Sequence, residues 1–321
     1  MPLLTNFKSA VKKLPVIREI VSERDKLHSE LVALRKDLVA LKQNLRFVPP
    51  GHFYSPIPSM EEILKDESTI FGPTPLEIPG VDLRESDQLK LLEQFVQFYV
   101  DMPFQPLKTE GLRYYFENPA YSYSDGIILH CMIRYLSPNK IIEVGSGFSS
   151  CMTLDTNEIY FDNRISTTFI DPYPALLNSL LKETDKDNTK TISCRLQDAD
   201  IAEFEALGLN DILFIDSTHV SKINSDVNRL FFEILPRLAP GVCVHFHDIF
   251  YPFEYPKKWI MEGRAWNELY MLRTFLQYNR SFEVVMMNTY MEHVHEIFFR
   301  EKMPLCLKNP GGSIWIRKVS N

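Results

Sequence analysis

The chain has 321 residues, of which 45% are hydrophobic and 24% charged, and its formal net charge is −7 at pH 7. This length is enough for one large domain with an appendage, and a negative balance excludes nucleic acid as the main partner because no basic excess neutralises phosphates. No apolar run is long enough to span a bilayer, and the five cysteines form no Cys-x-x-Cys pair. We therefore expect a reduced, cytoplasmic protein without a transmembrane segment.

The beginning of the chain has the pattern of helices that associate through an apolar seam. Residues 3–14 place apolar side chains and lysines at helical spacing, which is consistent with a lead-in helix or a weak membrane-surface helix. From Ile17 to Leu45, spacings of three and four alternate once Arg24 is counted, which defines a heptad repeat. The a positions are Ile17, Arg24, Leu31, Leu38 and Leu45, and the d positions are Ile20, Leu27, Leu34 and Leu41.

Charges flank this seam in a regular order. In the heptad register, Glu30 with Arg35 and Asp37 with Lys42 form attractive g-to-e′ pairs between parallel helices. We therefore expect residues 1–48 to be a coiled-coil helix that makes the protein a homo-oligomer. A single amphipathic helix packed on its own domain is the alternative, and leucine at both core positions leaves the strand number open.

Residues 49–85 are rich in proline, with seven prolines from Pro49 to Pro79. This composition predicts a linker or an extended arm. Its aromatic segment Gly51–Pro56 suggests an arm laid over the catalytic domain, either for anchoring or for contact with a substrate. Ser86 is then expected to cap the first helix of a domain that spans residues 86–321.

Residues 140–150 have the pattern of a buried strand that leads into a tight turn and a helix N-terminus. Gly145 and Gly147 allow a sharp backbone turn and a close approach by a ligand. A dinucleotide fingerprint would need a third glycine and a site for pyrophosphate. Here the third glycine is absent, and Glu143 at the strand end would repel phosphate. A carboxylate in this place suits an amine-bearing ligand such as S-adenosylmethionine (SAM).

Further apolar runs follow with helical patterns between them, which predicts a parallel sheet with helices on both faces. Each run ends in an acid or an amide: Ser166–Ile170 before Asp171, Thr191–Leu196 before Gln197 and Asp198, Ile212–Ile215 before Asp216, and Val242–Phe246 before His247 and Asp248. Two last runs, Phe282–Met287 and Ser313–Arg317, have no good helix between them and predict an antiparallel pair at one sheet edge. Ligands bind at the carboxyl ends of strands in such sheets, so these polar residues should share one rim.

From Ser124 onward, about two-thirds of the chain resembles class I SAM-dependent methyltransferases. The resemblance rests on the acid-then-glycines turn, on Asp216-x-x-His219 with Asp226 seven residues later, and on His247-Asp248 after the fifth strand. The subgroup with these motifs often acts in glycan or natural-product biosynthesis. The resemblance implies an α/β fold with a Rossmann-like, seven-stranded, mostly parallel doubly wound sheet and an antiparallel edge strand.

The resemblance also implies which residues bind SAM. Asp171 would accept two hydrogen bonds from the ribose diol, and Gln197 and Asp198 would lie beside the adenine, although a plain loop is as good an explanation for those two. The complete predicted cofactor set is Glu143, Gly145, Gly147, Ser149, Asp171, Gln197 and Asp198.

The residues that follow the fourth and fifth strands are the candidates for chemistry. In the resembled group they bind a divalent cation or remove the proton of the acceptor. Asp216 and Asp248 offer hard oxygen ligands for Mg²⁺ or Mn²⁺, and His219 or His247 has the right ordinary pKa for a base, with Asp216 assisting. Two imidazoles could instead select Mn, Fe or Zn. Asp226 either caps a helix or belongs to the site.

These features predict a SAM-dependent methyltransferase that methylates a hydroxyl of a glycan, sugar or other small molecule, with possible help from a metal ion. The aromatic stretch Ile249–Pro256 and Trp259 suggest a lid whose faces suit sugar rings, or simply a buried loop. The alternative function is a non-catalytic oligomeric scaffold that retains a SAM-binding fold. An NAD-dependent oxidoreductase is disfavoured by Glu143 and the missing third glycine.

Overall fold

The structure is a computed structural model that describes residues 15–44 and 47–320. It divides into two compact units, Met1–Ile70 and Phe71–Asn321. The helix expected within residues 3–14 and the last heptad position, Leu45, lie outside the described residues.

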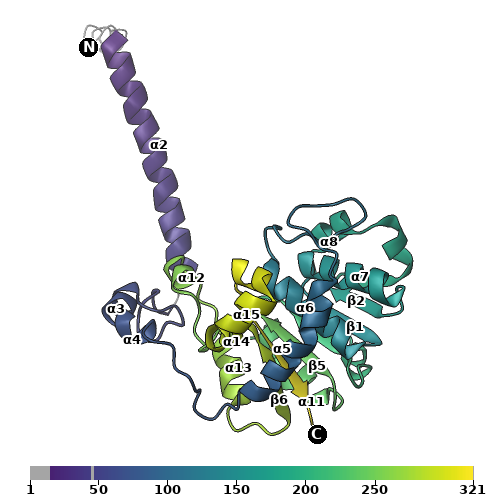
Figure 1. Cartoon of the computed structure of the whole chain (residues 1–321). Coiled ribbons are helices and arrows are strands. Elements are labelled where there is room, and N and C mark those ends of the chain that lie inside the picture. Colours follow the sequence, from purple (N-terminus) through teal and green to yellow (C-terminus); the bar gives the residue numbers. More distant parts are fainter. Residues whose placement is uncertain (1–14, 45–46, 321) are drawn as a thin grey trace, which may run out of the picture. The chain divides into compact units, whose positions relative to one another are not determined.

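The first unit contains the heptad segment as one continuous helix, α2 (Pro15–Asn44), seen at full length in Figure 1. The apolar side chains of the heptad seam are exposed along it, with exposed fractions of 46–68% for Ile20, Leu27, Leu31, Leu34 and Leu38. The side chain of Leu41 is not among those described. The single helix matches the predicted element, while its association with a second copy stays a prediction.

Two short helices lie within the proline-rich stretch, α3 (Met60–Lys65) and α4 (Glu67–Ile70). Ser59 caps α3 by accepting a hydrogen bond from the backbone of Glu62. Residues 71–85 belong to the larger unit, where Ile78 and Leu83 join its hydrophobic core. The stretch is therefore partly helical and partly packed, and not extended throughout.

The larger unit is built on a seven-stranded sheet with the order β3-β2-β1-β4-β5-β7-β6. Strands β1 to β5 are parallel, and β7 runs antiparallel to both β5 and β6. The strands are β1 (Lys140–Val144), β2 (Ser166–Ile170), β3 (Thr189–Ile192), β4 (Ile212–Ile215), β5 (Cys243–His247), β6 (Phe282–Met287) and β7 (Ser313–Lys318). This arrangement confirms the predicted Rossmann-like sheet, and its antiparallel pair is β6 with β7.

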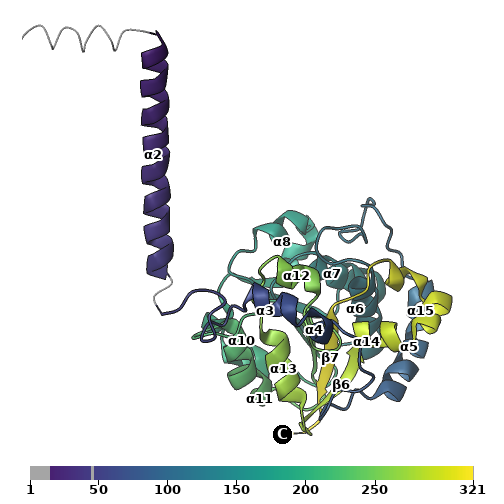
Figure 2. The same cartoon turned by 90° about the vertical axis from the view of Figure 1, so that its left-hand side faces the viewer.

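Helices cover both faces of this sheet (Figure 2). On one face, α6 (Tyr123–Leu136) packs between α5 (Glu85–Val100) and α7 (Phe148–Phe161). On the other face lie α10 (Asp226–Arg229), a π-helical turn η3 (Leu230–Ile234), α11 (Leu235–Arg237) and α13 (Glu268–Leu276). The remaining elements are α8 (Ala175–Leu180), η1 (Glu183–Asp187), η2 (Leu196–Asp198), α9 (Ile201–Glu205), α12 (Lys257–Met261), α14 (Asn288–Val294), α15 (Glu296–Lys302) and η4 (Pro304–Lys308).

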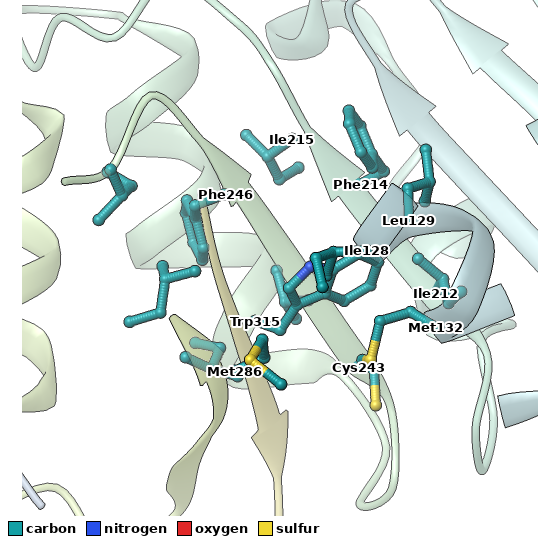
Figure 3. Close-up of a cluster of buried hydrophobic side chains, with 14 of the residues drawn as sticks. Ile128, Leu129, Met132, Ile212, Phe214, Ile215, Cys243, Phe246, Met286 and Trp315 are labelled. Atoms are coloured by element: carbon teal, nitrogen blue, oxygen red, sulfur yellow. The ribbon is translucent and has the colours of Figure 1, made fainter. Parts of the chain in front are cut away.

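The core lies where the two helical layers meet the sheet. Figure 3 shows Trp315 of β7 and Cys243 of β5 near Ile128 and Met132 of α6, with Phe246 farther along β5. Phe246 stacks on Phe231 of η3, at 5.6 Å between ring centroids. Burial of each such side chain stabilises the folded state by roughly 1.5–3 kcal/mol. None of the described helices is long and apolar enough to cross a membrane.

Three local predictions were wrong. β3 ends at Ile192 and not at Leu196, because its ladder with β2 stops where Ile170 does, and residues 196–198 form the 3₁₀ turn η2. Helices α14 and α15 and the turn η4 lie between β6 and β7, where no helix was expected. The N-cap of α5 is Arg84 in a left-handed conformation, so Ser86 lies inside the helix.

Candidate functional site

The turn after β1 lies directly against the end of β4. Gly145 has a φ of 80°, and a Cβ atom placed there would lie 1.7 Å from the backbone oxygen of Asp216. The backbone N–H of Asp216 in turn donates to the carbonyl of Val144. A side chain at position 145 is therefore excluded both by backbone conformation and by space. Gly147 is the N-cap of α7, with an extended φ of 173°.

Glu143 is completely buried under this turn. Its Oε1 accepts hydrogen bonds from the hydroxyls of Ser149 (2.6 Å) and Ser150 (2.9 Å). Burial raises the pKa of Glu143 to about 8, against the lowering effect of the two serines. Its Oε2 has no partner among the described residues, which is costly for a buried carboxyl oxygen and leaves it available to a ligand. The hydroxyl of Ser149 is committed to Glu143.

Asp171 follows β2 and points to the same turn. Its Oδ2 accepts hydrogen bonds from the backbone N–H and the hydroxyl of Ser146, at 3.1 and 2.7 Å, and its Oδ1 accepts one from the backbone of Tyr173 at 2.7 Å. Each carboxylate oxygen can accept two hydrogen bonds. Asp171 therefore ties the ends of β1 and β2 together and retains accepting capacity.

Gln197 and Asp198 are less closely connected to this turn. The amide of Gln197 donates to the carbonyl of Asn224 in the loop after β4, at 2.8 Å. Asp198 is exposed and bonded by Arg195 through two hydrogen bonds of 2.7 and 2.9 Å. This pairing with Arg195 lowers the pKa of Asp198. The carboxylate thus already has a cationic partner.

Three residues that follow β4 and β5 form a compact cluster. The Nε2 atom of His219 lies 3.3 Å from Oδ1 of Asp216 and 3.4 Å from Oδ2 of Asp248. One ligand atom from each residue can be chosen so that all three lie within 4.8 Å of one another, the one such group among the described residues that a metal ion could use. His219 and Asp248 both have φ values of 58°, in the left-handed region, and such conformations are concentrated at functional sites.

A buried glutamate behind this cluster was missed by the sequence analysis. Glu268, the first residue of α13, places Oε2 2.9 Å from Nδ1 of His219. Burial would lower the pKa of His219, but hydrogen bonds to Asp216 and Glu268 and nearby carboxylates raise it to about 10. An acidic residue in the first turn of a helix is ordinary, so nothing in the local sequence distinguishes Glu268.

The two histidines of β5 have different surroundings. His245 is buried with its ring 4.0 Å from that of Phe214, and burial lowers its pKa well below the usual value. His245 is therefore a core residue. His247 lies at the rim, where its Nε2 is 3.6 Å from Oδ1 of Asp248 and its buried Nδ1 has no partner among the described residues. Burial lowers the pKa of His247, but Asp216 and other nearby carboxylates outweigh it and raise that pKa.

Asp226 supports the loop that carries His219. Its carboxylate accepts hydrogen bonds from the backbone N–H (3.0 Å) and the hydroxyl (2.6 Å) of Thr218. The cap of α10 is Ser225, which accepts a bond from Asn228. Asp226 is therefore neither the helix cap nor a member of the metal-ligand group, and it holds the neighbouring backbone.

Comparison with known proteins identifies the family of the domain that carries this rim. A family model described as a methyltransferase domain matches residues 142–249, the stretch from β1 to the residues after β5. The sheet order, with an antiparallel β7 between β5 and β6, is that of the Rossmann-like methyltransferase fold. The chain belongs to the class I SAM-dependent methyltransferases. SAM is accordingly its methyl donor.

This methyltransferase also has individual relatives. An uncharacterised protein of Archaeoglobus fulgidus is 36% identical over 173 residues, which cover 52% of this chain and 76% of that protein. A crystal structure of an O-methyltransferase from Streptomyces achromogenes involved in tomaymycin synthesis, in complex with SAM, is 13% identical, covers 80% of this chain and 96% of that chain, and has a TM-score of 0.42. A methyltransferase of Podospora anserina bound to S-adenosylhomocysteine is 12% identical over 81% of this chain and 97% of that chain, with a TM-score of 0.41.

The methyltransferase has an aromatic group beside the cluster. The ring of Trp266 lies 4.4 Å from that of His219 and 5.4 Å from that of Trp259, which in turn contacts Phe250 at 5.1 Å. These three aromatic residues are partly exposed, whereas Tyr251, Phe253 and Tyr255 of the same loop are buried. The loop after β5 is therefore mostly core, and only its outer rings are open to a ligand. Trp266 was not identified in the sequence.

Proposed function

We propose that this methyltransferase transfers the methyl group of SAM to a hydroxyl group, and that a divalent cation assists it. The observation that carries this proposal is the contact between the two halves of the rim. The turn at Gly145 lies against the backbone of Asp216, and the side chain of Asp216 belongs to the cluster with His219 and Asp248. A methyl donor held at the turn and a hydroxyl held at the cluster would therefore be neighbours, as direct transfer requires.

On the cofactor side, the bound SAM supplies an electrophilic methyl group on its sulfonium. We assign Glu143, whose Oε2 has no partner in the described part of the chain, to the polar end of the cofactor. Asp171 would receive the ribose hydroxyls, and Gly145 and Gly147 would let the cofactor approach the backbone. Ser149 would act through its hydrogen bond to Glu143. Gln197 and Asp198 would border the adenine from the loop side.

On the acceptor side, the chemistry of the donor set fits a divalent ion. Asp216 and Asp248 would hold it through oxygen atoms, which hard cations prefer. Such an ion lowers the pKa of a hydroxyl that binds to it. Of the two candidate bases, His219 has both ring nitrogens directed at carboxylates. The Nδ1 atom of His247 has no partner among the residues described, and its Nε2 lies 3.6 Å from Asp248. We therefore assign proton removal to His247.

For the acceptor, we favour a sugar or a glycan over other small molecules. The rings of Trp259 and Trp266 are partly exposed beside the cluster, and the guanidinium of Arg264 lies over one face of each, at 4.3 and 5.0 Å, so that the other faces are the flat apolar surfaces. Such faces suit the axial C–H groups of a sugar ring, while the neighbouring carboxylates can accept hydrogen bonds from its hydroxyls. A panel of sugar and non-sugar hydroxyl compounds with methyl-labelled SAM tests this preference directly.

The decisive experiment compares binding with turnover. Calorimetry should show binding of SAM and none of NAD to the full chain. With an accepted hydroxyl compound, Asp216→Asn should abolish turnover and change SAM affinity less than twofold, and a chelator should inhibit until Mg²⁺ or Mn²⁺ is added. Absence of SAM binding would contradict the assignment. SAM binding without turnover on any hydroxyl compound would favour a non-catalytic scaffold, and unchanged rates with chelator would remove the metal.

We further propose that α2 associates with a second copy of this chain as a parallel coiled coil. In this division, residues 1–48 assemble the protein, residues 49–85 link the helix to the catalytic domain, and residues 86–321 form that domain. The exposed seam of α2 and the complementary pairs Glu30–Arg35 and Asp37–Lys42 support this proposal.

A matched pair of variants tests the seam in the full chain. Leu31→Glu with Leu38→Glu places charges at two a positions and should yield monomers in light scattering. Val32→Glu with Val39→Glu is the control, because these valines are equally exposed, at 53% and 55%, but lie at b positions. A monomeric wild-type chain, or equal effects of both pairs, would contradict the coiled coil.

A further inference from the structure

The backbone of His219 is fixed by hydrogen bonds from the start of α13. The backbone N–H groups of Asn267 and Glu268, at the start of α13, both donate to the carbonyl oxygen of His219, at 3.0 and 3.1 Å. The side chain of Asn267 also bonds the backbone of Ser221 in both directions, at 2.6 and 3.2 Å. The left-handed backbone of His219 is thus fastened to a helix that begins 49 residues later in the chain.

The side chain of His219 is oriented by the same helix. Glu268 has an exposed fraction of 1%, and its Oε2 lies 2.9 Å from Nδ1 of His219. A carboxylate at this distance accepts a hydrogen bond from Nδ1–H. In the neutral ring the lone pair is then on Nε2, which can bind a metal ion. Nε2 faces Asp216 and Asp248 at 3.3 and 3.4 Å. Atoms that share one ion at bond lengths of about 2.1 Å lie roughly 3–4 Å apart.

We propose that Glu268 is a positioning residue that makes His219 the nitrogen ligand of the cation centre. With this ligand, the centre takes an ion that binds imidazole, such as Mn²⁺ or Co²⁺, in preference to Mg²⁺. This inference rests on the cation centre of the proposed function. It follows from the donor set, because two carboxylate oxygens and one imidazole nitrogen suit ions softer than Mg²⁺, which favours oxygen alone. A carboxylate on the far nitrogen of a ligating histidine typically strengthens metal binding ten- to a hundredfold.

The hydrogen-bond partners of the Glu268 carboxylate also agree with this role. Its other oxygen, Oε1, has no partner among the described residues. Among the described residues, His219 is therefore the hydrogen-bond partner of this buried side chain.

The test uses the full chain with Mn²⁺ alone as the probe, without SAM or acceptor. Pulsed electron paramagnetic resonance of bound Mn²⁺ should show coupling to the ¹⁴N nucleus of a coordinated imidazole, and His219→Gln should abolish that coupling. Glu268→Gln should weaken Mn²⁺ binding severalfold, because its amide oxygen still accepts the Nδ1 proton without the charge. Glu268→Ala should weaken it ten- to a hundredfold. An equal concentration of Mg²⁺ should leave the signal unchanged.

The control is Glu292→Gln, which replaces a carboxyl that is also buried, at 7% exposure, but is hydrogen-bonded to Ser124 and not to a residue of the cluster. It should bind Mn²⁺ as the wild type does. Mn²⁺ binding without nitrogen coupling, displacement by equal Mg²⁺, or equal affinities in the Glu268 and Glu292 variants would each overturn the proposal. Absence of Mn²⁺ binding would do the same. SAM calorimetry on the same samples reports the proposed methyltransferase function separately, and confirms that each variant is folded.

Discussion

The turn after β1 and the cluster of Asp216, His219 and Asp248 lie on the same rim, but they are built differently. In the turn, Glu143 is bonded to side chains only six and seven residues away, Ser149 and Ser150. In the cluster, His219 depends on Glu268, which lies 49 residues further along the chain. The hydrogen bonds of Glu143 therefore join near neighbours in the chain, whereas the cluster depends on the docking of α13. SAM binding at the turn should be sensitive to added atoms, and metal binding at the cluster should be sensitive to the loss of distant contacts.

The largest effect is expected where the two regions touch. Gly145→Ala would place a methyl group 1.7 Å from the backbone oxygen of Asp216, at a φ of 80°. The backbone must move, so SAM affinity should fall by more than a hundredfold or the domain should fail to fold. Gly111→Ala is the control, because this glycine lies outside the site and has a similar φ of 85°, but an added Cβ would have nothing within 4 Å. Calorimetry and circular dichroism measure both, and equal affinities in the two variants would contradict the described turn.

A smaller effect should follow from removal of the two carboxylates of the turn. Glu143→Ala and Asp171→Ala should each weaken SAM binding about tenfold or more, since leaving a polar group of the bound cofactor without its hydrogen-bond partner costs roughly 1–3 kcal/mol. Asp198→Ala should cost less, because its carboxylate is exposed and bound to Arg195. Calorimetry with SAM ranks the three. Unchanged affinity for both Glu143→Ala and Asp171→Ala would remove them from the cofactor site.

The cluster should respond to a change that leaves the turn intact. Asp226→Ala removes both acceptors of Thr218, next to His219. We expect a loss of roughly three- to tenfold in Mn²⁺ affinity, because the loop loses one of its attachments, and no change in SAM affinity. Titrations with each ligand measure this difference. If SAM affinity falls in parallel with Mn²⁺ affinity, the two regions are not independent.

The smallest expected effect concerns pH, and it compares a carboxyl of the turn with one outside the site. Burial raises the pKa of both Glu143 and Glu292 from 4.5 to about 8. Between these values the folded chain keeps a proton that the unfolded chain has lost, so the free energy of unfolding falls as pH rises and levels off above pH 8. From pH 7 to 8 each group should contribute about 1 kcal/mol to this fall.

Denaturant unfolding at pH 7 and 8 checks this prediction. Glu292→Gln and Glu143→Gln should each remove about 1 kcal/mol of the pH-dependent loss, and only Glu143→Gln should also alter SAM binding. A Glu292→Gln chain whose stability falls with pH as much as the wild type would show that this carboxyl is ionised in the folded state.

The sequence by itself determined the parts of this protein whose pattern is local. The buried run ending in Glu143, the glycines at 145 and 147, and the acids after β2, β4 and β5 could be identified from spacing, because parallel strands bring their carboxyl ends to one edge. The heptad pattern likewise predicted the helix α2, since helical periodicity is a property of neighbouring residues. The family resemblance rested on these same short motifs.

Only the tertiary structure decided the features that depend on residues far apart in the chain. The end of β3 is set by the length of its ladder with β2, and an apolar run that continues to Leu196 carries no sign of this. Glu268 and Trp266 reach His219 because α13 packs back against the loop after β4. Asp226 likewise differs from an ordinary helix-start acid only through its contact with Thr218. Such contacts leave no periodic pattern in the sequence, because packing specifies them through space and not through spacing.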